Sequence, residues 1–447
     1  MLIVKTPREI KMILKFKIKN HLSIKDEVVL DFIATSKDKH FNFFCEEIGK
    51  YKILKIAMLF GPNASGKSNI LHSLDIFRNI VLNDNLNKND AIKQIPFEFD
   101  SSSKKLPTVF EIEFLINSDK FSYRIEFNDK YILSENLHIF APNKAKFFNR
   151  TTDNKTGKVL LVPGNKFNID EVDIRTIAGN TPPNMTILSG YNKTSLQIKI
   201  LTKTREWFQN YLNPIIEPRT KLTDYVKSKL HKDKINKELL INLLEKADLN
   251  IRDTTIDEFK ITKEMVESLK DENIDLYEIM KRRMGDKNEL VNLNLYFQHL
   301  IIQDSKEQIY KLQSSLESLG TLRYFGLSGV LTELIDKPGI LNIDELESSL
   351  HPDLLYHFIN TFMLNTKKSQ LIFTSHYYPL LEDTDELRKD VVWFTEKRED
   401  GSTDLYSLKD INIRSSLNYY KAYKTGKLGA KPFIGSSYLP NREVKDE

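Results

Sequence analysis

The pattern of apolar and polar positions in the first part of the chain predicts three strands and a helix. Residues 13–18 alternate between apolar side chains and lysines, and a short apolar run at 28–32 follows a turn. Residues 53–60 are apolar at nearly every position, which is typical of a strand that is buried on both faces. Residues 67–81 then carry apolar side chains at helical spacing. The predicted order is therefore strand, glycine-containing loop and helix.

The alternation of strands and helices returns near the end of the chain. We expect a helix over about 321–334, a strand over 339–343, a helix over 352–364 and strands over 370–373 and 391–394. Strands that alternate with helices are typical of a parallel sheet. The sequence therefore predicts an α/β fold whose two halves come from the two ends of the chain.

The middle of the chain follows other patterns. Residues 108–138 alternate in short runs separated by turns, which predicts an antiparallel meander, and the polar residues 143–158 resemble an exposed loop. The stretch after residue 201 is long, charged and almost without glycine, which we interpret as an inserted helical domain. The predicted parts are residues 12–201 with the antiparallel β lobe, the helical insertion 202–313, and residues 314–447, which complete the α/β core.

Composition narrows the class of protein. The chain has 447 residues, and its 66 Lys and Arg against 62 Asp and Glu leave a net charge of +4. This charge is too balanced to indicate that nucleic acid binds over the whole surface, so any basic binding surface must be local. Cys45 is the only cysteine and cannot close a disulfide within the chain, which favours a reducing compartment. No apolar run reaches the about 20 residues of a membrane span, and the first residues lack the pattern of a signal peptide. We expect a soluble, cytoplasmic protein with no membrane partner.

The loop after the buried strand carries a phosphate-binding motif. Gly61, Gly66, Lys67 and Ser68 fit the pattern G-x-x-x-x-G-K-[ST] between a strand and a helix. In such a loop backbone N–H groups surround a phosphate, the lysine contacts the β- and γ-phosphates, and the hydroxyl is a ligand of Mg²⁺. A glycine–serine turn with a solvated lysine is the alternative. The predicted nucleotide site consists of Gly61, Pro62, Asn63, Ala64, Ser65, Gly66, Lys67, Ser68 and Asn69.

Two further motifs end strands near the end of the chain. Asp344 and Glu345 follow the strand 339–343, where Asp344 can hold the Mg²⁺ shell and Glu345 can polarise the attacking water as a general base. His376 follows the strand 370–373, at the edge where open α/β sheets bind ligands, and can sense the γ-phosphate. A solvated acidic turn and a structural histidine are the alternatives. The P-loop upstream favours the catalytic interpretation.

The order of P-loop, long insertion, Asp-Glu pair and strand-terminal histidine resembles that of the ABC-type ATPases. The resemblance implies ATP and Mg²⁺ as cofactors, with Lys67, Glu345 and His376 as catalytic residues. It also implies a shared site, in which the signature loop of one copy caps the nucleotide held by another. Ser318 and Gly320 precede the Asp-Glu strand by one helix and are the candidate signature residues, although the local sequence departs from the common Leu-Ser-Gly-Gly-Gln form. We therefore expect a homodimer or a higher homo-oligomer.

A glutamine after the P-loop joins the metal site in ABC-type enzymes, and Gln94 is the candidate here. A turn residue is an equal alternative for Gln94. Ser318 is also placed to cap the N-terminus of the helix that follows it.

More narrowly, the chain resembles the stand-alone ABC-type ATPases of bacterial antiphage defence related to the OLD (overcoming lysogenization defect) and AbiL/RloA proteins. The motifs that carry this resemblance are residues 16–20 and 23–26, the P-loop with Asn69, and residues 107–114, 317–321, 344–352 and 423–432. OLD proteins continue into a Toprim nuclease domain, for which we expect no room after residue 432. The resemblance therefore implies a separate effector, Toprim or otherwise nuclease-like, that the ATPase controls in abortive infection. A phage trigger protein is a further expected partner.

A DNA-repair or chromosome-maintenance ATPase similar to RecF or SMC proteins is the second hypothesis. In that case the helical insertion and the aromatic, basic segment 419–429 would bind nucleic acid directly. A solvated amphipathic helix is the alternative for this segment, because phosphate-binding charge alone carries little specificity.

Overall fold

The chain divides into two compact units. The computed structural model describes residues 10–35, 37, 40–84, 87–140, 142–167, 169–382, 387–412 and 418–431, so Pro432 of the C-terminal motif lies outside the described residues. The first unit consists of Met1–Pro218, Pro338–Leu346 and Lys367–Glu447, and the second of Arg219–Lys337 and Glu347–Thr366. The second unit thus starts later than the insertion expected at residue 202 and includes the helix after the Asp-Glu pair.

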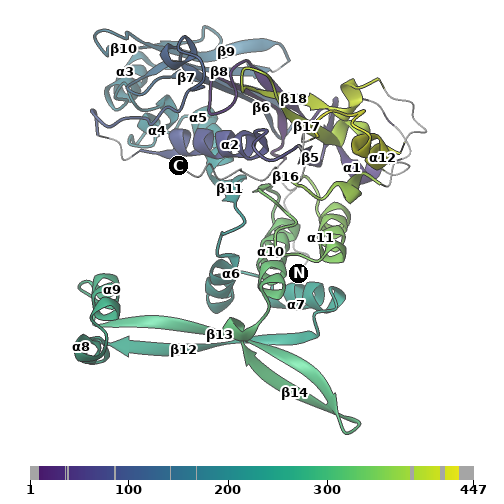
Figure 1. Ribbon diagram of the computed structural model, residues 1–447. Coiled ribbons are helices and arrows are strands. Elements are labelled where there is room, and N and C mark those ends of the chain that lie inside the picture. The colour runs from purple at the N-terminus through teal and green to yellow at the C-terminus, as the bar shows by residue number, and fades with distance from the viewer. Residues whose placement is uncertain are drawn as a thin grey trace, which may run out of the picture. The chain divides into compact units, whose positions relative to one another are not determined.

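A six-stranded sheet forms the α/β core of the first unit (Figure 1). Its strands, in spatial order, are β11 (Leu212–Ile216), β15 (Ile340–Ile343), β16 (Gln370–Thr374), β5 (Ile56–Phe60), β17 (Val392–Lys397) and β18 (Thr403–Ser407). Neighbouring strands run parallel except for the β17–β18 hairpin. Every residue of β5 and β16 is buried, as the apolar runs predict. Because β15, β16 and β5 are parallel neighbours, their carboxyl ends meet at one edge of the sheet.

A seven-stranded antiparallel sheet forms the second layer of the first unit. Its strands, in spatial order, are β10 (Val159–Pro163), β9 (Lys144–Thr152), β8 (Ile132–Phe140), β7 (Asp119–Phe127), β6 (Thr108–Ile116), β1 (Ile13–Lys19) and β2 (Val28–Asp31). The predicted meander is confirmed by β6, β7 and β8. The loop predicted at 143–158 is wrong, because β9 occupies most of it. Arg150 in β9 is buried and donates to the carbonyl oxygens of Ile132 and Pro183. A hydropathy pattern does not reveal that a charged residue is buried in this way.

An aromatic cluster joins the antiparallel sheet to helix α2 (Lys67–Leu82). Phe77 of α2 is fully buried and stacks on Tyr123 of β7, with ring centroids 5.8 Å apart. The same ring contacts Phe16 of β1, Phe110 of β6 and Phe208 of α5 (Lys199–Asn210). The helix that follows the P-loop is therefore packed on the antiparallel sheet through Phe77, in its C-terminal half.

Shorter elements complete the first unit. They are α1 (Phe41–Phe44), the β3–β4 hairpin (Cys45–Ile48 and Tyr51–Leu54), α3 (Glu171–Gly179), α4 (Ile187–Tyr191) and α12 (Tyr419–Lys424). In the part of the chain that the structure describes, no helix combines the length and the hydropathy of a membrane span.

The second unit contains both helices and a three-stranded antiparallel sheet, so the prediction of a predominantly helical insertion is wrong. Its helices are α6 (Leu222–His231), α7 (Lys237–Lys246), α8 (Lys263–Glu272), α9 (Ile274–Met284), α10 (Leu319–Asp336) and α11 (Pro352–Asn365). Its strands are β12 (Ile251–Thr262), β13 (Glu289–Gln303) and β14 (Lys306–Gln313). Leu293, Leu295 and Phe297 alternate with Asn294 and Tyr296, so the period is that of a strand, although the neighbouring segments are highly charged. β11, also inside the range 202–313, pairs with β15 of the parallel sheet.

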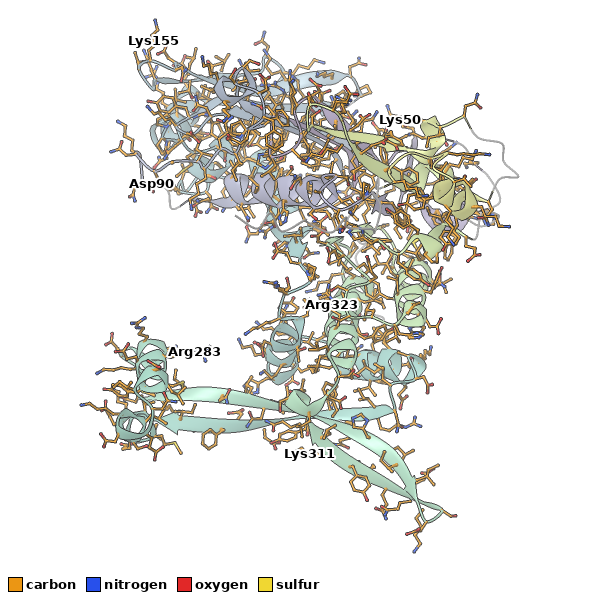
Figure 2. The ribbon with its side chains drawn as sticks, viewed as in Figure 1. Lys50, Asp90, Lys155, Arg283, Lys311 and Arg323 are labelled. Atoms are coloured by element: carbon orange, nitrogen blue, oxygen red, sulfur yellow. The ribbon has the colours of Figure 1, made fainter. Side chains whose placement is uncertain are left out.

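The central strand β13 belongs to two hairpins. Its first part pairs with β12, and helices α8 and α9 connect these two strands at their far end (Figure 1). Its last part pairs with β14, and only residues 296–299 pair on both sides. Figure 2 labels Arg283 on α9 and Lys311 on β14, where the lysine pairs with Asp257 of β12 at 2.9 Å.

Candidate functional site

The P-loop connects β5 to α2 at the carboxyl edge of the parallel sheet. Lys67 is buried, and its Nζ donates to the carbonyl oxygens of Gly61 at 2.9 Å and Pro62 at 3.1 Å. The lysine is therefore folded back over the loop, at the position where a phosphate would sit. Gly66 has φ +102°, and a Cβ there would lie 2.1 Å from Thr403 Oγ1, so this position requires glycine. Asn63 and Ala64 at the tip of the loop are exposed.

Side chains from distant segments support the P-loop from outside. Thr403 Oγ1 donates to the carbonyl oxygen of Ser65 at 2.9 Å and lies 2.6 Å from Ser23 Oγ. Asn69 Nδ2 donates to the same Ser23 Oγ at 2.7 Å, and Ser65 Oγ bonds to Thr395 Oγ1. The loop is therefore held by the β17–β18 hairpin and by the turn between β1 and β2. The sequence motifs do not reveal this support, because isolated serines and threonines carry no pattern.

The acidic group of the site lies next to the P-loop serine. Ser68 Oγ donates to Asp344 Oδ1 at 2.9 Å, and Thr374 Oγ1 donates to the same oxygen at 2.6 Å. Asp344 and Thr374 are both buried. The structure therefore brings Ser68 and Asp344 together, as the sequence predicts, and adds Thr374, which a strand pattern alone does not distinguish from an ordinary β-forming residue.

The same oxygens suit a hard divalent cation. No group of three or more His, Cys, Asp or Glu in the described ranges is arranged to hold a metal. Mg²⁺ commonly takes one or two carboxylates together with waters and substrate phosphate oxygens, rather than a cage made only of protein groups. Ser68 and Asp344 supply a hydroxyl and a carboxylate oxygen beside the phosphate-binding loop, so these residues fit Mg²⁺.

Glu345 is held in an unusual backbone conformation. Its φ is +48°, in the left-handed region, which costs about 1–2 kcal/mol for a residue with a Cβ. The Glu345 N–H donates to Thr374 Oγ1 at 2.8 Å, and the next amide, of Leu346, donates to the Thr374 carbonyl oxygen. The turn after β15 is therefore fastened to β16, and the half-buried Glu345 follows Asp344 directly at the sheet edge.

His376 lies at the same edge, two residues after the end of β16. The Ser375 amide donates to the carbonyl oxygen of Leu59 in β5, which fixes the backbone just before the histidine. The His376 side chain is half-buried. P-loop, Asp-Glu pair and histidine therefore follow three adjacent strands.

Gln94 lies outside this group of contacts. Its Nε2 donates to the Leu106 carbonyl oxygen at 2.9 Å and to Thr108 Oγ1 at 3.2 Å. These bonds fit the alternative of a loop residue, and the metal role of Gln94 stays a prediction.

The candidate signature residues belong to the second unit. Ser318 Oγ accepts from the Thr321 N–H at 3.0 Å and caps the N-terminus of α10, which confirms the predicted cap. Ser318 is exposed, and a Cβ on Gly320 would lie 2.9 Å from the Ser349 carbonyl oxygen. Glu317 Oε1 bonds to His299 Nε2 at 2.6 Å, which ties the segment before Ser318 to β13.

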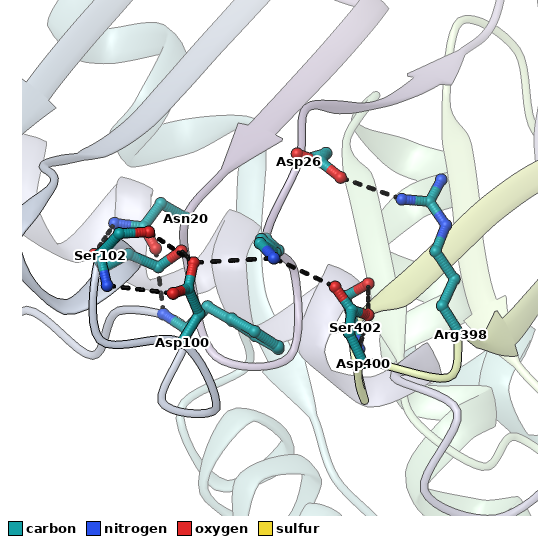
Figure 3. Close-up of polar contacts among 10 residues, drawn as sticks. Asn20, Asp26, Asp100, Ser102, Arg398, Asp400 and Ser402 are labelled. Atoms are coloured by element: carbon teal, nitrogen blue, oxygen red, sulfur yellow. Dashed lines mark hydrogen bonds and ion pairs between the residues drawn. The ribbon is translucent and has the colours of Figure 1, made fainter.

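A network of charged groups joins three loops near Ser23 (Figure 3). Lys25 Nζ lies 3.6 Å from Asp100 Oδ2 and 3.2 Å from Asp400 Oδ2. Hydrogen bonds from Ser402 and the charge of Lys25 lower the pKa of Asp400 to about 2. Hydrogen bonds from Ser102 are the main cause of a lowered pKa for Asp100. The carboxylates are therefore ionised at neutral pH and hold the loops to Lys25.

The aromatic segment near the C-terminus is packed. Tyr419 and Tyr423 of α12 are buried, and Tyr423 stacks on Tyr378 with ring centroids 3.6 Å apart. Lys421 and Lys424 of the same helix are exposed. This arrangement is that of an amphipathic helix, the alternative to a nucleic-acid-binding tail.

A phosphate-binding loop between a buried parallel strand and a helix, with Asp-Glu and histidine after the neighbouring strands, defines a P-loop ATPase fold of the ABC type. Over residues 56–383 the sequence matches the family described as "AAA domain, putative AbiEii toxin, Type IV TA system", and the chain belongs to this family. The predicted fold class, an α/β ABC-type head with an antiparallel β lobe, is thereby confirmed.

Two solved structures are similar to the chain at 12% sequence identity. One is the SMC head domain from Thermotoga maritima, with a match that covers 88% of this chain and 98% of that chain at a TM-score of 0.39. The other is a crystal structure of the SmcHead bound to the C-winged helix domain of ScpA, with coverages of 88% and 97% and a TM-score of 0.38. Comparison with curated proteins returned no match.

Proposed function

We propose that the chain binds ATP with Mg²⁺ at the P-loop and hydrolyses it to ADP and phosphate. The observation that supports this best is the convergence of the Ser68 and Thr374 hydroxyls on one oxygen of Asp344, beside the buried Lys67. When bound, Mg²⁺ supplies positive charge to the phosphate oxygens. The family membership supports the same reaction.

Each residue of the sheet edge then has a defined task. Lys67 exchanges the carbonyl oxygens of Gly61 and Pro62 for the β- and γ-phosphates. Glu345 accepts the proton of the attacking water as general base, and His376 donates a hydrogen bond to the γ-phosphate. Ser68 and Asp344, with Gln94 as a further candidate, hold the metal.

Titration calorimetry with ATP and Mg²⁺, followed by assays of phosphate release, tests this proposal. We expect Lys67→Ala to lose binding, and Glu345→Gln to keep binding while hydrolysis falls about 10²- to 10⁴-fold. Lys311→Ala, on the exposed hairpin of the second unit, is the matched control and should change neither. Hydrolysis by Glu345→Gln at the wild-type rate would rule out Glu345 as the base.

We further propose that nucleotide binding produces a homodimer or a higher homo-oligomer. The exposed position of Ser318 at the N-terminus of α10 supports this, because a partner copy can reach it. Light scattering of Glu345→Gln with and without ATP should record a doubled mass with ATP, and Ser318→Arg should prevent it. An unchanged monomer in both conditions would contradict the shared site.

The biological role that we propose is control of a separate effector, Toprim or otherwise nuclease-like, in antiphage abortive infection. The motif resemblance to OLD-like and AbiL/RloA-like ATPases supports this role. In cells that carry the intact locus, Lys67→Ala and Glu345→Gln should both restore phage plating. Escaper phages would then point to the trigger protein. Unchanged plating in both variants would count against the defence role.

Direct DNA binding, as in RecF- or SMC-like maintenance ATPases, is the competing proposal. The exposed Lys421 and Lys424 on α12 are the observation in its favour. ATP-stimulated duplex binding that weakens steeply with salt, and is lost when both lysines are replaced by glutamate, would select it.

A further inference from the structure

An exposed phenylalanine lies in the loop between α2 and β6. The Phe99 side chain is 72% exposed, and Phe97, two residues earlier, is buried beneath it with ring centroids 5.7 Å apart. Gly401, in the β17–β18 turn, lies against the Phe99 ring: a Cβ on Gly401 would be 2.7 Å from a ring carbon. The ring is therefore supported by packing from below and from one side and still presents much of its surface to solvent.

The position of Phe99 is fixed by the charged network beside the P-loop. Asp100, its neighbour, pairs with Lys25, and Lys25 also pairs with Asp400, the neighbour of Gly401 (Figure 3). Two residues before Lys25, Ser23 accepts a hydrogen bond from Asn69 at the start of α2. A chain of direct contacts thus leads from the P-loop helix to the loop that carries the exposed ring.

The chemistry of the P-loop sets the direction of a bound nucleotide. Lys67, Ser68 and Asp344 mark the end where the β- and γ-phosphates and the metal lie. Asn69 follows Ser68 in α2 and bonds to Ser23, so we place the nucleoside on the side of the loop that Ser23 supports. A nucleobase is a flat apolar ring that gains free energy when an aromatic side chain covers its face.

We propose that Phe99 is the platform on which the nucleobase of the bound nucleotide stacks, and that Lys25 holds this platform in place through Asp100 and Asp400. This assignment rests on the proposed function, and it adds a residue that acts on the base rather than on the phosphates. Lys397, with Nζ 5.7 Å from the centre of the Phe99 ring, borders the same platform. Phe99 is thus a specificity-determining residue for nucleoside triphosphates over bare polyphosphate.

Titration calorimetry with two probes, ATP and inorganic tripolyphosphate, tests the platform in the presence of Mg²⁺. We expect Phe99→Ala to weaken ATP binding about ten-fold and to leave tripolyphosphate binding unchanged, because stacking concerns only the base. Phe259→Ala, at an exposed phenylalanine on β12, is the matched control and should change neither.

A second variant gives a direct signal. The two native tryptophans, Trp207 and Trp393, are at most 3% exposed, so an indole placed at residue 99 reports on the site above a constant background. In Phe99→Trp, ATP should quench the added fluorescence and tripolyphosphate should not, with ATP affinity retained.

Three outcomes would contradict the proposed role of Phe99 as a stacking platform. ATP binding by Phe99→Ala at wild-type strength, while Lys67→Ala loses it, would place the base elsewhere and leave the proposed ATPase intact. Equal weakening for ATP and tripolyphosphate would make Phe99 a structural residue of the loop. Failure of the wild-type chain to bind either probe would refute both the platform and the proposed ATPase.

Discussion

The P-loop region of the first unit and the β13–β14 hairpin of the second differ in how their side chains are used. Around the P-loop even small polar residues are buried and paired: Thr395 and Thr403 are 0% and 2% exposed. On the hairpin large apolar residues face solvent, with Ile302 72% and Ile309 63% exposed. The P-loop region is thus held by buried, paired polar groups, whereas a two-stranded hairpin gains little stability from its own packing. Substitutions in the two regions should differ accordingly.

The largest expected difference concerns the core under α2. Phe77→Ala removes the ring that contacts β1, β6, β7 and α5, and should lower the free energy of unfolding by about 3–5 kcal/mol. Ile302→Ala on the hairpin should change it by less than about 0.5 kcal/mol. Urea denaturation followed by circular dichroism measures both. A similar loss for the two variants would show that the hairpin is as well packed as the core.

Acid should weaken the first unit through His21. Burial lowers the pKa of His21 to about 4, below its ordinary value of 6.5, so between these pH values the unfolded chain binds a proton that the folded chain does not. The free energy of unfolding should therefore fall by about 2–3 kcal/mol from pH 7 to pH 4 because of this group. His21→Leu should remove that part of the slope.

Thr374 connects the fold to the proposed chemistry. Thr374→Val removes the hydroxyl that donates to Asp344 and accepts from the Glu345 amide, and should slow phosphate release about ten-fold. Thr374→Ser keeps the hydroxyl and should restore the rate. Equal rates in Thr374→Val and the wild type would contradict a role for the hydroxyl. Unfolding curves of both variants separate a catalytic loss from a loss of stability.

The smallest expected effect is on the hairpin surface. Lys311→Ala removes an exposed ion pair with Asp257 and should change the free energy of unfolding by about 0.5 kcal/mol or less. The effect should disappear at high salt, because exposed charges are screened. A larger, salt-independent loss in denaturation experiments would mean that this pair organises the crossing of the two hairpins.

The sequence predicts the carboxyl edge of the parallel sheet well, because the strands there are short and buried. Gly61 and Asp344 follow β5 and β15 directly, and His376 comes two residues after β16. It fails where a residue's partner is distant along the chain. The polar sequence around Arg150 resembles that of a loop, although the Arg150 side chain is buried and bonds to two carbonyl oxygens of the fold. Ser23 and Thr403 support the P-loop from segments 380 residues apart, and no local pattern indicates that pair.

The second unit was hard to predict for a different reason. β13, with 15 residues, has only one charged residue of the Asp, Glu, Lys and Arg types, Glu289, but it stands within a block of highly charged segments that resemble solvated helices. Only the two-residue period of Leu293, Leu295 and Phe297 distinguishes it, and Phe297 is buried against Phe325 of α10. Burial on one face over so few residues gives a weak signal within a long, charged block of sequence.

Because β13 belongs to both hairpins, the two hairpins share one short stretch of backbone. Within β13, only residues 296–299 pair with a strand on both edges. His299 lies in this stretch, and its Nε2 bonds to Oε1 of Glu317, the residue immediately before Ser318. Both hairpins are therefore connected to the residue before the α10 cap through one side-chain contact, that of His299 with Glu317.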